Sequence, residues 1–323
     1  MYTVTEKGIW SGRVDSEIDW DMFRLHQVIH IEDLSAFHEA QLNPAIGIIG
    51  FKSDEGVKRN KGRAGAYDAP DEIRRALSSI PSHLISNGKL FDFGNVRCED
   101  GDLEKAQAEL GEYVQKMMSL NIYPVIMGGG HEVAYGHFLG LKPYWKQGRQ
   151  VGILNFDSHF DMRPYDEMTS SGTMFKQMAD ELANENIPFH YMCIGIQRYG
   201  NTKHLFETAK RYGCEYILED EIAQLGIEEV NRRINAFIQK NDAVMVTLCS
   251  DVIGASYAPG VSAPQPFGME PNVLRLLLKE AMKQKKTVSF DIAEINPKLD
   301  VDNQTVKLAA AFIVEIIDSV LSN

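Results

Sequence analysis

Residues 151–163 read VGILNFDSHFDMR, an apolar run that passes directly into alternating acidic and imidazole side chains. The continuously hydrophobic run 151–156 is typical of a strand that helices cover on both faces of a parallel sheet. In the extended segment that follows, Asp157, His159 and Asp161 point the same way because alternate residues of a strand share a face. The stretch therefore predicts a buried strand with a group of metal ligands at its carboxyl end.

Five further apolar runs predict strands of the same buried kind. They are AIGIIGF at 45–51, IYPVIMG at 122–128, YMCIGI at 191–196, AVMVTLC at 243–249 and TVSFDI at 287–292. Helical patterns lie between or after them, at 70–79, 103–119, 227–240, 272–286 and 304–321. This alternation predicts an α/β protein of three layers, in which a doubly wound, mostly parallel sheet lies between helices.

We expect residues 1–323 to form a single domain, because no internal repeat, low-complexity tract or linker divides the chain. Residues 1–40 alternate less clearly and are a candidate N-terminal arm. The segment 304–321 is strongly apolar, but three charged residues interrupt it. That pattern favours a buried closing helix over a membrane span.

The composition excludes several classes of partner. The formal net charge is −12 and there is no run of lysine and arginine, so nucleic acid is not an expected partner. The first residues lack the basic and apolar regions of a signal peptide, and no segment is long enough to span a bilayer. We therefore expect a cytoplasmic protein with no membrane partner. Cys98, Cys193, Cys214 and Cys249 form no CxxC motif and are expected to be reduced thiols.

Polar residues of one chemical kind follow four of the predicted strands. His131, Asp251 and Glu294 each come soon after one of them, as the segment 157–161 does. In an open parallel sheet the carboxyl ends of the strands border the ligand crevice. Each residue alone would more often be a helix cap or a solvated carboxylate, but their joint placement at one edge favours a common site. Imidazole and carboxylate ligands together suit Mn²⁺, Zn²⁺ or Fe²⁺.

At this point the chain resembles the ureohydrolase family, the arginase-like manganese hydrolases. The matching stretches are WSGRVD at 10–15, GVKRNKGRAGAYDAPDEIRRAL at 56–77, MGGGHEVAYGH at 127–137, NFDSHFDMR at 155–163, SSGTMF at 170–175, APGVSAPQPFG at 258–268 and SFDIAEINPKLD at 289–300. Within the family, the chain resembles the branch that hydrolyses N-formimino-L-glutamate to L-glutamate and formamide in histidine degradation. The residues that carry this closer resemblance are Gly130, the loop 58–66 and Arg163. The resemblance implies an arginase-like fold, two Mn²⁺ ions, a small-molecule substrate and a homo-oligomer, a trimer or hexamer.

The resemblance also implies a ligand set. One Mn²⁺ would be held by His131, Asp157, Asp161 and the first acid of the family's DxD pair. The other Mn²⁺ would be held by Asp157, His159 and both acids of that pair. Here the pair aligns with TLCSD at 247–251, so Cys249 stands at its first position and Asp251 at its second.

Two interpretations of Cys249 remain open. A thiolate could ligate a metal, although sulfur suits softer metals than Mn²⁺. The alternative is an inert buried thiol, with one metal bound firmly and the second weakly or not at all.

Four residues are candidates for catalysis and substrate binding. By the resemblance, Asp161 would hydrogen-bond the attacking water and help to move a proton to the departing nitrogen, and Glu294 would face the cationic formimino group. Arg163 and Arg63 are candidates for binding the substrate carboxylates. The structural alternatives are an ion pair of Arg163 with a nearby acid and a surface charge for Arg63. Arginase has a proton-shuttling histidine after the metal motif, but this chain has no histidine between 159 and 190.

The sequence is also compatible with two other functions. The same site could hydrolyse agmatine, guanidinobutyrate or another guanidino or amidino acid, although Arg163 favours an anionic substrate. Because Cys249 replaces a bridging aspartate, the chain could also be a metal-binding paralogue with weak catalysis. All of these functions except the last make the protein a hydrolase of C–N bonds in linear amidines.

Overall fold

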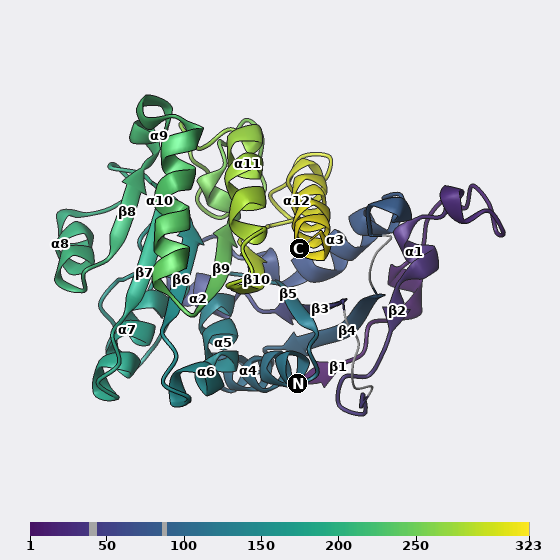
Figure 1. Ribbon diagram of the computed structural model, residues 1–323, viewed down its shortest axis with the longest axis horizontal. Coiled ribbons are helices and arrows are strands. Elements are labelled where there is room, and N and C mark those ends of the chain that lie inside the picture. The colour runs from purple at the N-terminus through teal and green to yellow at the C-terminus, as the bar shows by residue number, and fades with distance from the viewer. Residues whose placement is uncertain (39–43, 86–88, 323) are drawn as a thin grey trace.

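A ten-stranded sheet forms the centre of the part of the chain that the computed structural model describes, residues 1–38, 44–85 and 89–322 (Figure 1). The strands are β1 (Tyr2–Thr3), β2 (His30–Ile31), β3 (Ala45–Lys52), β4 (Lys89–Arg97), β5 (Tyr123–Met127), β6 (Val151–Phe156), β7 (His190–Ile196), β8 (Glu215–Leu218), β9 (Ala243–Cys249) and β10 (Thr287–Ala293). Their order is β1-β4-β3-β5-β10-β9-β6-β7-β8, and β2 pairs with β4. Strand β1 runs antiparallel to β4, whereas the other pairs are parallel.

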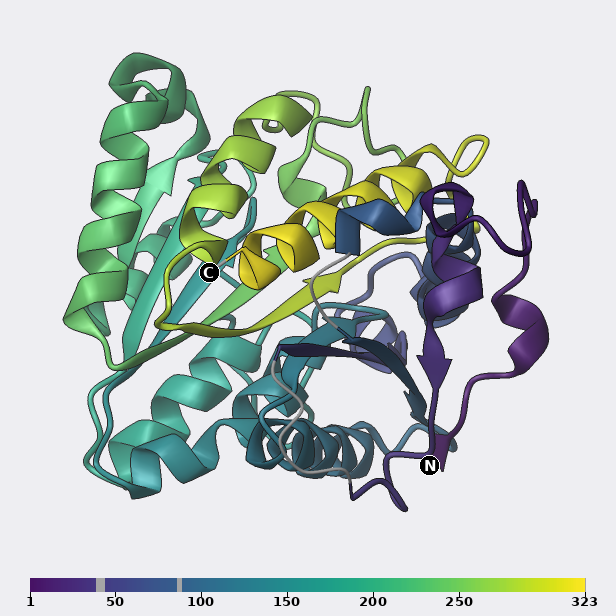
Figure 2. The same ribbon diagram turned by 45° about the vertical axis from the view of Figure 1, so that its right-hand side comes forward.

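Helices cover both faces of this sheet. They are α1 (Leu25–Val28), α2 (Glu55–Arg59), α3 (Ala69–Ser78), α4 (Leu103–Ser119), α5 (Val133–Gly140), α6 (Lys142–Lys146), α7 (Met174–Asn184), α8 (Lys203–Arg211), α9 (Glu219–Leu225), α10 (Ile227–Lys240), α11 (Pro271–Met282) and α12 (Gln304–Leu321). In Figures 1 and 2, α3 and α10–α12 lie along one face and α4–α7 along the other. The predicted three-layer α/β architecture is confirmed.

The apolar core divides into two parts because successive strand residues face opposite sides of the sheet. In β3, Ile46 and Ile48 belong to the core under α3 and α12, whereas Ile49 and Phe51 belong to the core under α4 and α5. All eight residues of β3 are buried. Continuous burial of this kind is what the uninterrupted apolar runs predict.

The six predicted strands correspond to β3, β5, β6, β7, β9 and β10, and the five predicted helices to α3, α4, α10, α11 and α12. Sequence reasoning missed β4, which contains polar residues on its buried face. It also missed that the candidate N-terminal arm contributes edge strands, because β1 and β2 both pair with β4. Residues 39 and 40 of that arm lie outside the described residues.

A buried ion pair fixes the N-terminal segment and α3 against β4. The guanidinium of Arg74 donates to both carboxylate oxygens of Asp92 at 2.8 Å, and to Oδ1 of Asn95 at 2.7 Å. Nε1 of Trp10 donates to the same carboxylate at 2.6 Å. Both Arg74 and Asp92 are fully buried. The carboxylate is therefore stable in the core only while its donors are present.

We expect the substitution Arg74→Met to lower the free energy of unfolding by roughly 3–5 kcal/mol, because it leaves Asp92 as a buried and unbalanced charge. Urea denaturation measures this difference. The matched control is Arg75→Met on the same helix, where an exposed pair with Glu72 contributes about 0–1 kcal/mol. Equal losses in the two variants would contradict the assignment.

Candidate metal centre

Four adjacent strands in the middle of the sheet deliver the predicted site residues. The strands β5, β10, β9 and β6 are neighbours in that order and are mutually parallel, so their carboxyl ends meet at one edge. His131 follows β5, Glu294 follows β10, and the segment 157–161 follows β6. Cys249 is the last residue of β9, and Asp251 lies in the short 3-10 turn after it. The predicted convergence at the strand ends is therefore present in the fold.

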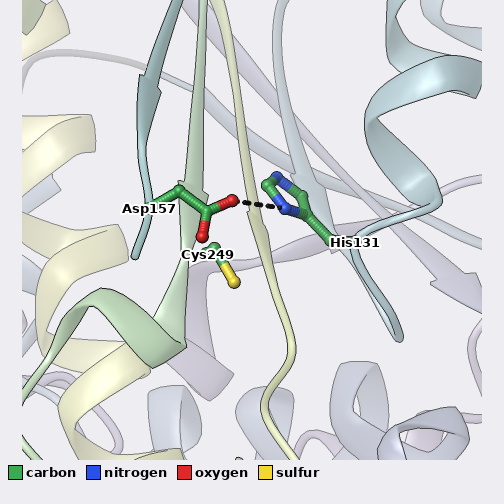
Figure 3. A group of neighbouring side chains, drawn as sticks. All are labelled: His131, Asp157 and Cys249. Carbon is green, nitrogen blue, oxygen red and sulfur yellow. Dashed lines mark ion pairs between the residues drawn. The ribbon is translucent and has the colours of Figure 1, made fainter. Parts of the chain in front are cut away.

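A first group of candidate ligands consists of His131, Asp157 and Cys249 (Figure 3). Their ligand atoms lie within 4.8 Å of one another, and all three side chains are buried. Nδ1 of His131 is 3.0 Å from Oδ2 of Asp157 and 3.2 Å from Oδ2 of Asp161. Asp161 is thus close to this group through His131, although it is not one of the three mutually close ligands.

A second group consists of Asp157, His159 and Asp251, whose ligand atoms also lie within 4.8 Å of one another. Nδ1 of His159 is 3.1 Å from Oδ2 of Asp251 and 3.6 Å from Oδ1 of Asp157. Asp157 belongs to both groups. Of the two bridging positions in the predicted ligand set, Asp157 is shared by both observed groups, whereas Cys249 belongs to the first group only.

Two of the candidate carboxylates stand on backbone of positive φ. The φ angle is 47° at Asp161 and 64° at Glu294. Residues with a Cβ seldom adopt this left-handed conformation, which persists only where the surrounding structure holds it. Such conformations are frequent at functional sites. The backbone N–H of Glu294 donates to Gly129 O at 2.8 Å, and the carbonyl of Asp161 accepts from Phe175 N–H. Backbone hydrogen bonds thus hold the local chain at each of these two residues.

The glycine loop before His131 allows a close approach of two chain segments. A Cβ on Gly129 would lie 1.8 Å from the carbonyl oxygen of Ser53, and one on Gly130 would lie 2.0 Å from Oε2 of Glu132. The carbonyl of Ser53 also accepts from Gly130 N–H at 2.9 Å. Gly129 is therefore required for the loop to pack against the segment after β3, two residues before His131.

Burial and mutual charge shift the pKa values of the cluster. Burial lowers the pKa of His131, but hydrogen bonds to Asp157 and Asp161 outweigh it and raise that pKa well above its usual value. Burial and the nearby charge of Glu132 raise the pKa of Glu294 to about 8. Burial, with Asp157 and Asp251 nearby, raises the pKa of the Cys249 thiol. Burial and negative neighbours thus favour the neutral forms of Glu294 and Cys249, whereas the adjacent carboxylates favour protonation of His131.

A cavity of ≈ 80 Å³ opens over the cluster. Seven predicted site residues line it, namely Arg163 and the six candidates His131, His159, Asp161, Cys249, Asp251 and Glu294. The buried Nε of Arg163 has no hydrogen-bond partner among the described residues. The predicted alternative of an ion pair between Arg163 and a nearby acid does not occur there.

Arg63 lies apart from this cavity lining. Its Nε donates to the carbonyl of Ser262 at 2.9 Å and its Nη2 to the carbonyl of Val261 at 2.7 Å. These bonds fasten the glycine-rich loop to the segment 258–268. Its guanidinium is therefore engaged with backbone, whereas that of Arg163 retains a free donor.

Sequence reasoning missed three polar residues that line the cavity, namely Asn60, Ser171 and Ser262. All three lie inside stretches that carry the family resemblance. Their membership of those stretches was the available signal, but short polar residues in loops have no periodicity that marks a binding role. A larger groove of ≈ 1070 Å³ lies beside α9 and the start of α11 and contains none of the predicted site residues.

Comparison with known proteins identifies the family. Residues 44–318 match the model of the Arginase family. The chain belongs to the arginase family. It is 49% identical over 315 residues to a formimidoylglutamase from Geobacillus sp. (strain WCH70), covering 98% of this chain and 95% of that protein.

Solved structures show that this arginase-family protein has the same fold as its relatives. The crystal structure of formimidoylglutamase from Bacillus subtilis matches with a TM-score of 0.81 and 23% identity, covering 94% of each chain. The structure of Trypanosoma cruzi formiminoglutamase with Mn²⁺ matches with a TM-score of 0.79 and 24% identity, covering 90% of this chain and 99% of that one. The predicted arginase-like fold is therefore confirmed.

The donor atoms at the strand ends fit a divalent cation. Imidazole nitrogen, carboxylate oxygen and sulfur are gathered in two compact groups. Oδ1 of Asp251 is buried and has no hydrogen-bond partner among the described residues. Buried carboxylates that lack enough protein donors are the arrangement that metal coordination satisfies. In the described part of the chain, no helix combines the length and the apolar character needed to cross a membrane.

We expect Mn²⁺ to stabilise the folded protein, because it would bind the clustered carboxylates in the native state and not in the unfolded chain. At a concentration 100 times the Kd the gain is about 2.7 kcal/mol, measurable as a rise in the thermal unfolding temperature. Asp157→Asn should abolish the gain, since Asp157 belongs to both groups. Asp166→Asn, an exposed acid nearby, should leave it unchanged. An equal gain in both variants would show that the ion binds elsewhere.

Proposed function

We propose that this protein hydrolyses N-formimino-L-glutamate to L-glutamate and formamide with the aid of divalent metal ions. Formimidoylglutamases are full-length relatives of the chain, and the 49% identity extends over 98% of it. The observation that carries the proposal is that Arg163, whose Nε has no hydrogen-bond partner among the described residues, lines the same cavity as the ligand cluster. A cation next to a hydrolytic centre suits an amidine substrate that also carries carboxylates.

Two metal sites that share Asp157 are the best interpretation of the ligand groups. His131, Asp157 and Cys249, with Asp161 nearby, would form one site, and Asp157, His159 and Asp251 the other. A dication lowers the pKa of a neighbouring thiol, which opposes the rise that burial causes at Cys249. We therefore propose that Cys249 is a thiolate ligand and that the metal is Mn²⁺ or a softer divalent ion.

Bound cations would supply Lewis-acid polarisation and would lower the pKa of water from 15.7 toward roughly 7. The reaction itself adds water to the formimino carbon and breaks the bond from that carbon to the glutamate nitrogen. Asp161 lines the cavity and would accept a proton from the attacking water and return it to the departing nitrogen. No histidine shuttle is needed for this transfer, since one carboxylate both accepts and donates the proton.

Glu294 would bind the formimino group. One of its oxygens, Oε1, accepts the backbone N–H of His131 at 2.9 Å, which fixes the direction of the carboxylate. The side chain lines the cavity, so its remaining acceptor capacity can face a planar, cationic N–H pair. The positive φ at Glu294 serves the same orientation.

The two arginines would have different tasks. Arg163 would bind a substrate carboxylate, and its packing is set by its own N–H, which donates to Gly172 O at 2.9 Å. Arg63 would act indirectly, because its bonds to the carbonyls of Val261 and Ser262 hold the cavity rim. We further propose that the protein is a single-domain cytoplasmic enzyme that forms a trimer or hexamer, which light scattering can determine.

A panel of substrates tests the proposed function. The metal-loaded protein should hydrolyse N-formimino-L-glutamate with a higher kcat/KM than agmatine or guanidinobutyrate, measured by release of formamide or urea. Hydrolysis of the guanidino compounds alone would assign another member of the family. Metal binding without turnover of any substrate would favour the weakly catalytic paralogue for which Cys249 is the motivating feature.

We expect Arg163→Met to lower kcat/KM for N-formimino-L-glutamate roughly 10- to 100-fold, the value of one lost charge-assisted hydrogen-bonded pair. The control is a change of substrate. N-butylformamidine has the reacting group but no carboxylate, so its kcat/KM should be nearly equal in the wild type and the variant. A similar loss for both substrates would remove Arg163 from carboxylate recognition.

Cobalt reports directly on sulfur ligation. The Co²⁺-loaded wild type should show a sulfur-to-metal charge-transfer band in the near ultraviolet, and Cys249→Ser should lose it. Cys193→Ser is the matched control, because Cys193 is also a buried free thiol, on the neighbouring part of the sheet. A band that survives in Cys249→Ser would exclude this sulfur as a ligand.

A further inference from the structure

A row of buried, hydrogen-bonded polar side chains begins at Nε2 of His131, the ring nitrogen on the side away from the ligand cluster. Nε2 of His131 lies 3.0 Å from Oγ1 of Thr247, which donates to Oδ1 of Asp291 at 2.7 Å. Oδ2 of Asp291 lies 2.6 Å from Nδ1 of His137, whose Nε2 lies 2.6 Å from Oγ of Ser289. All five residues are buried, and none is more than 1% exposed.

The direction of these hydrogen bonds follows from which atoms carry protons. A carboxylate only accepts hydrogen bonds, so the hydroxyl of Thr247 must donate its single proton to Asp291. That hydroxyl can then only accept from His131. His131 must therefore keep a proton on Nε2, so Nδ1 is the ring nitrogen that can release its proton and offer a lone pair to a metal. Nδ1 is the atom that lies beside Asp157 and Asp161.

We propose that Thr247 and Asp291 are positioning residues that hold His131 in its Nε2–H form and so present the Nδ1 lone pair to the metal. His137 supports this arrangement because its Nδ1 contacts the second oxygen of Asp291. Ser289 in turn contacts Nε2 on the other side of the His137 ring. The inference rests on the proposed function in one respect, namely that His131 is a metal ligand. Partners of this kind set the tautomer and the orientation of a ligating histidine.

The fold explains why these residues meet. Thr247 and Asp291 are direct partners in the parallel pairing of β9 with β10. Ser289 and Asp291 occupy alternate positions of β10 and therefore share the face toward which His137 points from α5. Since α5 begins two residues after His131, the row returns to the chain segment that carries the ligand. The hydrogen bonds thus fasten the start of α5 to the two central strands.

Loss of the Thr247 hydroxyl should have a specific cost. In Thr247→Val the Nε2–H of His131 would be buried without an acceptor, and the proton would be more favourably placed on Nδ1, where Asp157 and Asp161 accept it. Metal binding would then require that proton to move. Changes to partners of a ligating histidine lower metal affinity about 10- to 100-fold.

Calorimetric titration of the metal-free full-length protein with Mn²⁺ tests the inference. Thr247→Val should raise the Kd about 10- to 100-fold, whereas Thr247→Ser, which keeps the hydroxyl, should change it only a few-fold. The matched control is Thr287→Val on β10. Its buried hydroxyl donates to Ala281 O at 2.8 Å, away from the site, so this variant loses a comparable hydrogen bond but should keep the wild-type Kd.

A spectroscopic measurement separates positioning from general loss of stability. In Zn²⁺-loaded protein with ¹⁵N-labelled histidine, the His131 resonance, assigned from its absence in His131→Asn, should show a proton on Nε2 and none on Nδ1. The Nε2 proton should shift upfield in Thr247→Val, which lacks the acceptor, and remain in place in Thr247→Ser and Thr287→Val.

Two results would overturn the inference while leaving the proposed function intact. One is an unchanged Mn²⁺ affinity in Thr247→Val, and the other is a His131 proton on Nδ1 in the metal-loaded wild type that still hydrolyses N-formimino-L-glutamate. A wild type that binds no divalent cation and hydrolyses no formimino compound would instead overturn the proposed function, and with it the role assigned to Thr247 and Asp291.

Discussion

The carboxylate of Asp157 is the interaction on which the rest of the site depends, because it is common to both groups of candidate ligands. It is fully buried and accepts the backbone N–H of His159 at 2.8 Å and the side-chain amide of Asn155 at 3.2 Å. These bonds fix where both of its oxygens point. Further carboxylates lie nearby, and such a gathering in the interior is unfavourable unless cations or strong donors compensate it. The rest of the local structure can be understood as holding this charge in place.

The backbone bears part of the cost of that arrangement. Left-handed conformations at residues such as Asp161 and Glu294 cost on the order of 1–3 kcal/mol each and persist only where the surroundings determine them. Here the surroundings are four adjacent strands whose residues are buried on both faces. The close approach at Gly129 and the row from His131 to Ser289 add fixed points on the same edge. A rigid sheet therefore supports loops that would not hold these positions alone.

The sequence predicted the central strands, the helices α3, α4 and α10–α12, and the edge where the ligands meet, because long apolar runs, helical patterns and the polar residues after strands are local signals. It did not predict β4, since Asp92 and Asn95 interrupt the apolar pattern, and their burial depends on hydrogen bonds from distant residues such as Arg74 and Trp10. The row through Thr247 and Asp291 was also out of reach. It depends on the register of β9 with β10, which pairs residues 44 positions apart and leaves no periodic trace in either strand.

The replacement of an expected oxygen ligand by Cys249 makes the two proposed metal positions chemically unequal. The group around His131 offers nitrogen, oxygen and sulfur, whereas the group around His159 offers nitrogen and oxygen only. Harder ions such as Mn²⁺ prefer the second set, and softer ions such as Zn²⁺ gain more from the first. The shared carboxylate of Asp157 couples the two positions, because an ion at either one draws on the same charge. An ion at one position would therefore affect which ion the other position favours, and this asymmetry would follow from a single sulfur atom at the end of β9.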